Sequence, residues 1–320
     1  MSQPDDDAGT ADAENTVLKA RDLRVRYGRT EVFTGLNLTV RAGEAVALLG
    51  RNGVGKSSLV RCLLGQQRPS GGTVRLFGAD VWRHRARLMT RVGVVPEDGD
   101  APPSMNARQL SSFCRALYPA WDQPGFNRRL ERFEISAKTA FGELSRGQKT
   151  QVMLALALAP SPEFLLLDDP TLGLDAVARR AVFEELVGEL ADRGTTVLLT
   201  SHDLPGIESL ATRIAALAGG RLVLDEPLED LKARHRWLTV GVDAGDLGGD
   251  LEALEPIDEM SLGAHQRSVL VSRWREGWRP VRRAEGEEIP MARLDPRPAS
   301  LEEILVASTA GEREPEDARR

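Results

Sequence analysis

The chain has 320 residues, of which 42 are basic and 48 acidic, giving a formal net charge of −6. A hydrophobic fraction of 41% with 28% charged residues excludes disorder of the whole chain, and the length suits about two domains of ~150 residues each. The acidic balance argues against a broad nucleic-acid-binding face, and an aromatic content of 5% argues against a large surface for stacking single-stranded nucleic acid.

Between polar tails at residues 1–15 and 311–320, short β-rich runs alternate with helical stretches, which predicts an α/β core around a buried, mostly parallel sheet. The expected strands are Val17–Val25, Val32–Val40, Glu44–Leu49, Thr73–Phe77, Val92–Val95, Phe164–Leu167, Thr195–Thr200, Arg213–Leu217 and Arg221–Leu224. The expected helices are Lys56–Leu64, Ala107–Tyr118, Pro124–Phe133, Gly147–Ala159, Ala176–Asp192 and Leu204–Leu210.

Residues 236–310 have a different pattern, which predicts a small α+β appendage without a recognisable catalytic motif. Its expected strands are Trp237–Val242 and Ser268–Ser272, separated by the Gly- and acid-rich stretch Asp243–Glu259. Its expected helix is Ser300–Ala307, with Ser300 as N-cap and Glu303 at the capping-box position.

The two cysteines, Cys62 and Cys114, lack the spacing of a zinc site or a disulfide framework, so a reducing compartment is expected. The acidic start of the chain is unlike a signal peptide. The longest apolar runs, such as Val152–Ala159, are far shorter than the ~20 residues of a membrane span. The sequence thus predicts a soluble, cytosolic chain.

The strongest chemical signal is the sequence Gly-Arg-Asn-Gly-Val-Gly-Lys-Ser-Ser at residues 50–58. It fits the phosphate-binding pattern GxxxxGK[ST], and it lies between a strand and a helix as that pattern requires. Backbone N–H groups of such a loop surround a phosphate, Lys56 neutralises the β- and γ-phosphates, and the Ser57 hydroxyl binds Mg²⁺. The residues predicted to contact nucleotide here are Gly50, Arg51, Asn52, Gly53, Val54, Gly55, Lys56, Ser57 and Ser58.

A second apolar run, Phe164–Leu167, is followed by two carboxylates, Asp168 and Asp169. Alone, this pattern is an ordinary strand end. Beside a phosphate loop, it is the way in which nucleotide hydrolases hold Mg²⁺ next to the phosphates. The sequence therefore predicts that Asp168 binds the metal.

Further motifs follow in the order found in ABC ATPases. Leu144 and the sequence Ser145-Arg-Gly-Gln148 resemble the LSGGQ signature of that family, at a position 89 residues after Lys56 and 23 before Asp168. Leu172-Gly-Leu-Asp175 resembles the D-loop of the family. Both intervals are similar to those of ABC ATPases, and the resemblance covers about residues 16–235.

This resemblance implies a P-loop ABC ATPase core with an antiparallel β-subdomain and a helical subdomain at about residues 98–160. It also implies ATP and Mg²⁺ as cofactors, and a dimer in which the signature of one subunit closes over ATP held by Lys56 of the other. The other residues to which it gives a role are Tyr27 (adenine stacking), Glu97 (metal and catalysis), Ser145, Arg146, Gly147 and Gln148 (nucleotide), Asp169 (catalysis), Asp175 (nucleotide) and His202 (switch histidine).

Three positions differ from the usual pattern of the family. Glu97 stands in place of the Q-loop glutamine, and Arg146 replaces the middle glycine of the signature, where the side chain is expected to point outward. Asp169 occupies the place of the catalytic glutamate and is one methylene shorter, so its carboxylate reaches ~1.5 Å less far, a misplacement that can cost about 100-fold in rate.

The resemblance implies an ATP-hydrolysing subunit that drives a separate membrane permease from the cytoplasmic face of the membrane. Glu97, the segment Leu117–Asp122 and the segment Ser300–Val306 are most similar to ATPases that serve type-2 exporter permeases. Residues 98–122, with an exposed Trp121, are expected to face the permease.

Three alternative functions compete with this interpretation. Ribosome-associated ABC proteins carry two cassettes in one chain, whereas this sequence has one phosphate loop. Chromosome and repair ATPases insert long coiled coils between the nucleotide motifs, and the interval here is not heptad-patterned. A slow regulatory subunit of a heterodimer stays open, because Asp169 is combined with an intact signature. Homodimer and heterodimer are both compatible with the sequence.

Overall fold

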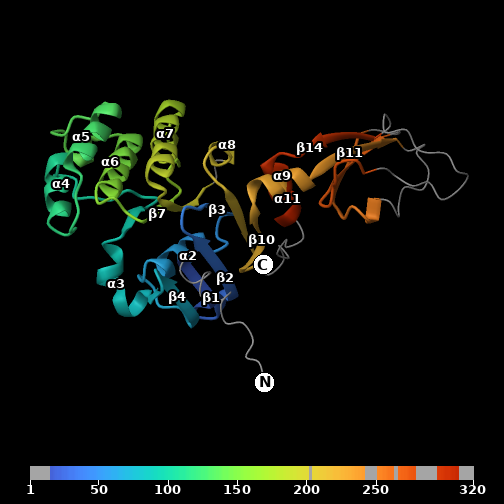
Figure 1. Ribbon diagram of the computed structural model, residues 1–320, viewed down its shortest axis with the longest axis horizontal. Coiled ribbons are helices and arrows are strands. Elements are labelled where there is room, and N and C mark those ends of the chain that lie inside the picture. Colours follow the sequence, from blue (N-terminus) through green and yellow to red (C-terminus); the bar gives the residue numbers. More distant parts are fainter. Residues whose placement is uncertain (1–14, 202–203, 242–250, 263–265, 279–293, 310–320) are drawn as a thin grey trace, which may run out of the picture. The chain divides into compact units, whose positions relative to one another are not determined.

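The computed structural model describes residues 15–201, 204–241, 251–262, 266–278 and 294–309 (Figure 1). The chain divides into two compact units, Met1–Asp225 and Glu226–Arg320. This division falls before residue 236, where the sequence suggested a boundary, because the helix α9 (Leu228–Arg234) belongs to the second unit.

The first unit contains a six-stranded sheet in the order β10-β9-β3-β8-β7-β6, and its pairs from β9 to β6 are parallel. The central strands β7 and β8 are almost completely buried, which explains why they are continuous apolar runs in the sequence. The strands are β3 (Ala45–Gly50), β6 (Val92–Val95), β7 (Phe164–Asp168), β8 (Thr196–Thr200), β9 (Arg213–Ala218) and β10 (Arg221–Pro227).

The register of this sheet fixes the position of the polar residues at its carboxyl edge. Leu48 of β3 and Asp168 of β7 both pair with Thr200 of β8. The phosphate loop, which begins at Gly50, and the two aspartates therefore leave the sheet at the same edge, where ligands bind in open parallel sheets.

A second sheet of the first unit is antiparallel, in the order β2-β1-β4-β5, as the resemblance implied. Its strands are β1 (Thr16–Tyr27), β2 (Thr30–Arg41), β4 (Gly71–Leu76) and β5 (Ala79–Asp80). The inner face of this sheet and one side of the parallel sheet share a hydrophobic core that includes Phe33, Leu38 and Phe164.

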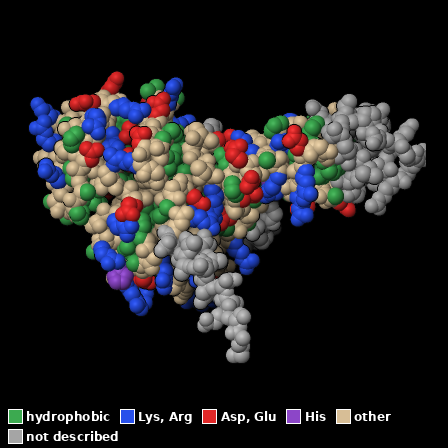
Figure 2. All heavy atoms as spheres, viewed as in Figure 1, with side chains coloured by type: hydrophobic (Ala, Val, Ile, Leu, Met, Phe, Trp, Pro, Cys, Tyr) green, Lys and Arg blue, Asp and Glu red, His purple; other side chains and the backbone are tan. Residues whose placement is uncertain are grey.

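Four helices, α4 to α7, lie side by side in the first unit, and Figure 2 shows acidic and basic side chains interspersed over them. None of the described helices has both the length and the apolar content needed to cross a bilayer. The helices of this unit are α2 (Lys56–Leu63), α3 (Val81–Met89), α4 (Ala107–Arg115), α5 (Gln123–Arg132), α6 (Arg146–Leu158), α7 (Ala176–Arg193) and α8 (Leu204–Ile207), with a 3₁₀ turn η1 at Phe141–Glu143.

The sequence missed one helix, and its expectation for the exposure of one side chain was wrong. The sequence did not predict α3, which is rich in arginine and buries only Val81 and Leu88. Trp121 is half-buried instead of exposed, because its Nε1 donates to Gln123 Oε1 at 3.1 Å and its ring lies against Phe126.

The second unit has a four-stranded antiparallel sheet in the order β12-β13-β11-β14, with its own apolar core around Leu238 and Val269. Its elements are α9, β11 (Arg236–Gly241), β12 (Pro256–Ser261), β13 (Gln266–Val271), β14 (Leu294–Pro298) and α11 (Leu301–Thr309). The predicted capping box of α11 is present, since Glu303 N donates to Ser300 Oγ and Ser300 N donates to Glu303 Oε2. The sequence missed α9, β12 and β14.

Candidate functional site

The phosphate loop has the backbone conformation that its glycines permit. Gly55 directly precedes α2 and has φ +111°, and a Cβ there would lie 2.5 Å from Val32 Cγ1 and 2.9 Å from Phe33 Cζ. Only glycine fits this position without displacing the core. The free N–H groups at the start of α2 are consequently directed toward the space in front of the loop, as an anion site requires.

Lys56, the first residue of α2, reaches back across the loop. Its Nζ donates to the carbonyl oxygen of Gly50 at 2.7 Å and to that of Arg51 at 3.3 Å, and the residue is only 8% exposed. Burial lowers the pKa of the Lys56 ammonium below its ordinary value, and nearby carboxylates oppose that shift. These carboxylates are, in order of effect, Asp169, Asp168 and Glu97.

The two aspartates after β7 are held by Thr200 at the end of β8. The Thr200 hydroxyl donates to Asp168 Oδ1 at 2.6 Å and accepts from the backbone N–H of Asp169 at 3.0 Å. Asp169 is 6% exposed and has φ +49°, a left-handed conformation that aspartate tolerates better than most residues. Sequence reasoning missed Thr200, whose only signal was a polar residue at the end of a neighbouring buried strand.

A cleft of about 410 Å³ brings the predicted residues together. It is lined by Asn52, Gly53, Gly55, Lys56, Ser57, Ser58, Glu97, Asp168, Asp169 and Leu172. The described residues contain no group of three or more His, Cys, Asp or Glu side chains that would bind a metal by themselves. The cleft does place Ser57, Glu97 and Asp168 around one space, and this oxygen donor set fits a Mg²⁺ ion that takes its remaining ligands from phosphates and water.

Tyr27 lies at the end of β1 and is 46% exposed. Its hydroxyl is hydrogen-bonded to Ser58 Oγ at 3.2 Å and donates to Gln67 Oε1. The bond to Ser58 is the largest cause that lowers the pKa of the Tyr27 phenol, and its partial burial raises it. The ring is thereby fixed beside the first turn of α2, next to the phosphate loop.

The signature-like segment begins α6 but does not line the cleft described above. Ser145 is the N-cap, and its hydroxyl accepts from Gln148 N at 3.2 Å while Gln148 Oε1 accepts from Ser145 N at 3.0 Å. Gly147 packs against α7, since a Cβ there would lie 3.4 Å from both Leu174 and Ala178.

The Arg146 side chain lies over the turn at Gly173 and is half exposed, with Nη2 3.7 Å from Asp98 Oδ1. It thus lies along the protein surface between two loops, which differs from the outward direction expected from the sequence. Asp175 is the N-cap of α7, where its carboxylate accepts from Ala178 N at 2.8 Å. His202 lies outside the described residues.

Known proteins are similar to this chain in sequence and in fold. A family model described as "ABC transporter" matches residues 33–172. The Nod factor export ATP-binding protein I of Ralstonia nicotianae is 32% identical over 309 residues, which cover 92% of this chain and 94% of that protein. The ABC transporter ATP-binding protein YtrB of Bacillus subtilis is 29% identical over 298 residues, 93% of this chain and 99% of that protein.

A solved structure of the ATP-binding subunit of an ABC transporter superposes with a TM-score of 0.62 and 26% identity, covering 68% of this chain and 92% of that one. The similarity in sequence extends over nearly the full length of the Ralstonia protein. The chain therefore belongs to the ATP-binding proteins of ABC transporters.

Proposed function

We propose that this chain binds and hydrolyses MgATP and thereby drives a separate integral-membrane permease, as an exporter. The observation that carries this proposal is the cleft in which Lys56, Ser57 and Asp168 face one another at the carboxyl edge of the parallel sheet. The proposed ATPase domain is residues 16–235, with residues 98–160 as its helical subdomain and residues 236–310 as the appendage.

The predicted site residues have proposed roles in ATP binding and hydrolysis. The phosphate loop holds the triphosphate, and Lys56 exchanges its bonds to loop carbonyls for the β- and γ-phosphates. Ser57, Glu97 and Asp168 hold Mg²⁺, which neutralises charge on the phosphates when bound. Tyr27 stacks on the adenine, Asp169 accepts a proton from the attacking water, and His202 has the role of the switch histidine.

Two copies of the chain close over ATP in this proposal. Ser145 and the backbone at Gly147 begin a helix of 13 residues whose N-terminus favours an anion. These residues, with Arg146 and Gln148, do not line the cleft of their own chain, so they are available to a nucleotide held by a second copy. Asp175 lies next to them at the start of α7 and contacts the same interface.

The proposed permease contact is the surface formed by residues 98–122. Within it, Phe113 on α4 is 61% exposed and Leu117, just after α4, is 60% exposed. A pair of large exposed apolar side chains is typical of a docking surface. This contact places the protein at the cytoplasmic face of a membrane. The relative from Ralstonia is named for export, which supports the direction of transport.

A second candidate function is that of a slow subunit in a heterodimer. The observation in its favour is Asp169, whose shorter side chain places the carboxylate farther from a water at the γ-phosphate than glutamate would. The Asp169→Asn variant separates the two candidates, because it should form stable ATP-dependent homodimers by light scattering only if one chain is sufficient. Monomers under the same conditions favour a second, different subunit.

Calorimetric titration with MgATP tests the proposed function. Lys56→Ala should weaken MgATP binding by 10-fold or more, because it removes the buried ammonium that faces the phosphates. Lys138→Ala is the matched control, since Lys138 is an exposed lysine outside the cleft and its loss should leave the affinity unchanged. Equal MgATP affinity of the wild-type protein and Lys56→Ala would contradict the proposal.

Cross-linking tests the permease contact. In a chain whose Cys62 and Cys114 are replaced by alanine, a single cysteine at Phe113 should cross-link to the membrane partner in isolated membranes, and a single cysteine at Thr73, on β4, should not. The reverse pattern would rule out residues 98–122 as the docking surface.

A further inference from the structure

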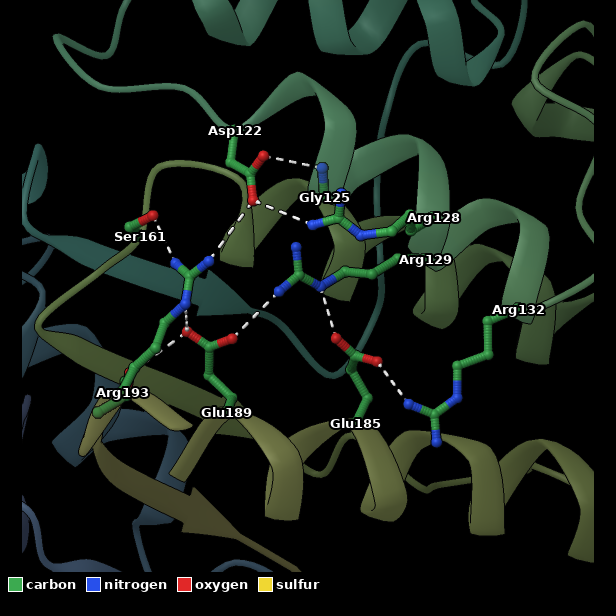
Figure 3. A network of polar contacts seen from close by, with 10 residues as sticks. Asp122, Gly125, Arg128, Arg129, Arg132, Ser161, Glu185, Glu189 and Arg193 are labelled. Carbon is green, nitrogen blue, oxygen red and sulfur yellow. Dashed lines mark hydrogen bonds and ion pairs between the residues drawn. The ribbon is translucent and has the colours of Figure 1, made fainter. Parts of the chain in front are cut away.

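Arg129, on α5, is a buried cation that joins two helices far apart in the sequence (Figure 3). Its Nε donates to Glu185 Oε1 at 2.6 Å and its Nη2 donates to Glu189 Oε2 at 3.1 Å, both on α7. The side chains of Arg129, Glu185 and Glu189 are 9%, 11% and 3% exposed. These three charges therefore form one buried ion group between α5 and α7.

Further contacts extend this group along both helices. Arg132 donates to Glu185 Oε2 at 3.1 Å toward one end. At the other end, Arg193 at the end of α7 donates to Ser161 Oγ and lies 3.5 Å from the carboxylate of Asp122, the N-cap of α5. The start of α5 therefore lies beside the end of α7, and the two helices run antiparallel (Figure 3).

The helix α6 packs against both α5 and α7. The backbone N–H of Asp122 donates to the carbonyl of Ala159, the C-cap of α6, at 2.7 Å. At the opposite end, Gly147 packs against Ala178 of α7. The helix α6 therefore packs against both of the helices that the ion group joins, and its N-cap is Ser145.

The chemistry of the ion group favours a role in position over a role in stability. Burying three charges carries a large desolvation cost, and buried ion groups are often no more stabilising than apolar side chains of similar volume. Moreover, Arg129 Nη1 is buried and has no hydrogen-bond partner within the described part of the chain. The planar guanidinium bonds two carboxylates in fixed directions, so it restricts how α5 and α7 can shift, whereas apolar contacts are less directional.

We propose that Arg129 is a positioning residue for ATP hydrolysis: by bridging Glu185 and Glu189 it fixes α6 on α7 and so sets where Ser145 meets the nucleotide of the second copy. This inference rests on the proposed function. Arg129 itself contacts neither the cleft nor the signature-like segment, so the effect of its loss passes through the position of α6.

An apolar variant, Arg129→Met with Glu185→Leu and Glu189→Leu, tests the proposal. Its unfolding midpoint should equal or exceed that of the wild type, and its KM for ATP should change less than about 2-fold, because the phosphate loop is untouched. Its kcat should fall about 10-fold or more, since a displacement of ~1 Å is sufficient for a loss of that size. A folded apolar variant with wild-type kcat would overturn the proposal.

Arg129→Lys gives a second test that does not depend on the apolar variant folding. The substitution keeps the buried positive charge but cannot bond two carboxylates in a fixed fork, so kcat should fall while KM and the unfolding midpoint change little. Full kcat in Arg129→Lys would also overturn the proposal. Arg180→Met is the matched control, because it removes an exposed arginine that pairs with Glu184 on α7, and kcat should be retained.

Spin labels separate failure of this inference from failure of the proposed function. Labels at Lys149 on α6 and Val187 on α7, with Cys62 and Cys114 replaced by alanine, report the distance between the helices without ATP turnover. We expect a broader or shifted distance distribution in the apolar variant. An unchanged distribution contradicts positioning by Arg129, whereas a wild-type protein without ATPase activity contradicts the proposed function alone.

Discussion

The hydroxyl of Thr200 donates a 2.6 Å hydrogen bond to Asp168, joining the last residues of two neighbouring parallel strands through their side chains. The same hydroxyl accepts the backbone N–H of Asp169. One threonine therefore orients the carboxylate proposed to bind Mg²⁺ and anchors the backbone of the residue proposed to activate water.

Thr200→Val keeps the shape of the side chain and removes both hydrogen bonds. We expect the free energy of unfolding to fall by roughly 1 kcal/mol, because the Asp168 carboxylate loses one hydrogen bond while the N–H of Asp169 keeps the backbone carbonyl of Thr200 as its acceptor. We expect kcat for ATP to fall about 10-fold or more. Thr212→Val is the control, since the Thr212 hydroxyl binds the backbone of Ala45 on the same sheet and does not line the cleft. Thr212→Val should lower the free energy of unfolding and leave kcat unchanged. A Thr200→Val enzyme as active as Thr212→Val would contradict this role.

Asp169→Glu should raise steady-state ATPase activity by about 10-fold, because the longer side chain brings the carboxylate nearer to the attacking water. The same change should lower the free energy of unfolding by roughly 1 kcal/mol, since φ at this residue is +49° and glutamate tolerates that region less well than aspartate. Asp169→Asn, which suits the backbone, should be stable and inactive. If Asp169→Glu hydrolyses ATP no faster than the wild type, side-chain length is not limiting.

Gly173→Ala should disturb the turn before α7 in two ways. Gly173 has φ +73°, and a Cβ there would lie 3.1 Å from Cδ and Nη1 of Arg146. Relieving the contact with Arg146→Ala should restore part of the unfolding midpoint lost in Gly173→Ala. Additive effects of the two substitutions in thermal denaturation would show that the arginine does not pack on this turn.

Glu303→Gln should change how the stability of the second unit depends on pH. Burial raises the pKa of the Glu303 carboxyl, but hydrogen bonds from Arg297 and Ser300 outweigh it and lower the pKa to about 2. A carboxyl with a lowered pKa in the folded state stabilises above its unfolded pKa of ~4.3, and this stabilisation is lost as pH falls toward 2.

The unfolding midpoints of wild type and Glu303→Gln should therefore differ most at neutral pH and converge between about pH 4.5 and 2. Glu302→Gln, at an exposed position one residue earlier, should follow the wild type throughout. A difference between wild type and Glu303→Gln that does not vary with pH would contradict the ion pair and capping box as its source.

The sequence predicted the parts of the site that depend on neighbours along the chain. The phosphate loop, the strand before Asp168 and the caps at Ser145 and Ser300 are each encoded within about ten residues, so their patterns are visible without a fold. The strands β7 and β8 were equally recognisable, because both of their faces are buried and their inner residues, Phe164–Leu167 and Val197–Leu199, are all apolar.

The parts that were missed depend on segments that meet only in the folded chain. No pattern in the sequence distinguishes Thr200 from other threonines, because its role depends on the strand register that pairs it with Asp168. The strands β12 and β14 are the two edges of their sheet; β12 is mostly exposed and β14 contains two prolines, so neither shows the alternation typical of a strand. Trp121 appeared exposed because its partners, Gln123 and Phe126, belong to the next helix.

The hydrogen bonds of Lys56 affect the rate at which the protein binds its nucleotide. Because its ammonium donates to the carbonyls of Gly50 and Arg51, the chain's own hydrogen bonds hold the curved conformation of the loop. Binding is then an exchange of partners, with little conformational entropy left to lose. We therefore expect diffusion, and not a folding step of the loop, to limit the association rate constant. This rate constant should then fall in inverse proportion to solvent viscosity, and its temperature dependence should follow that of the viscosity.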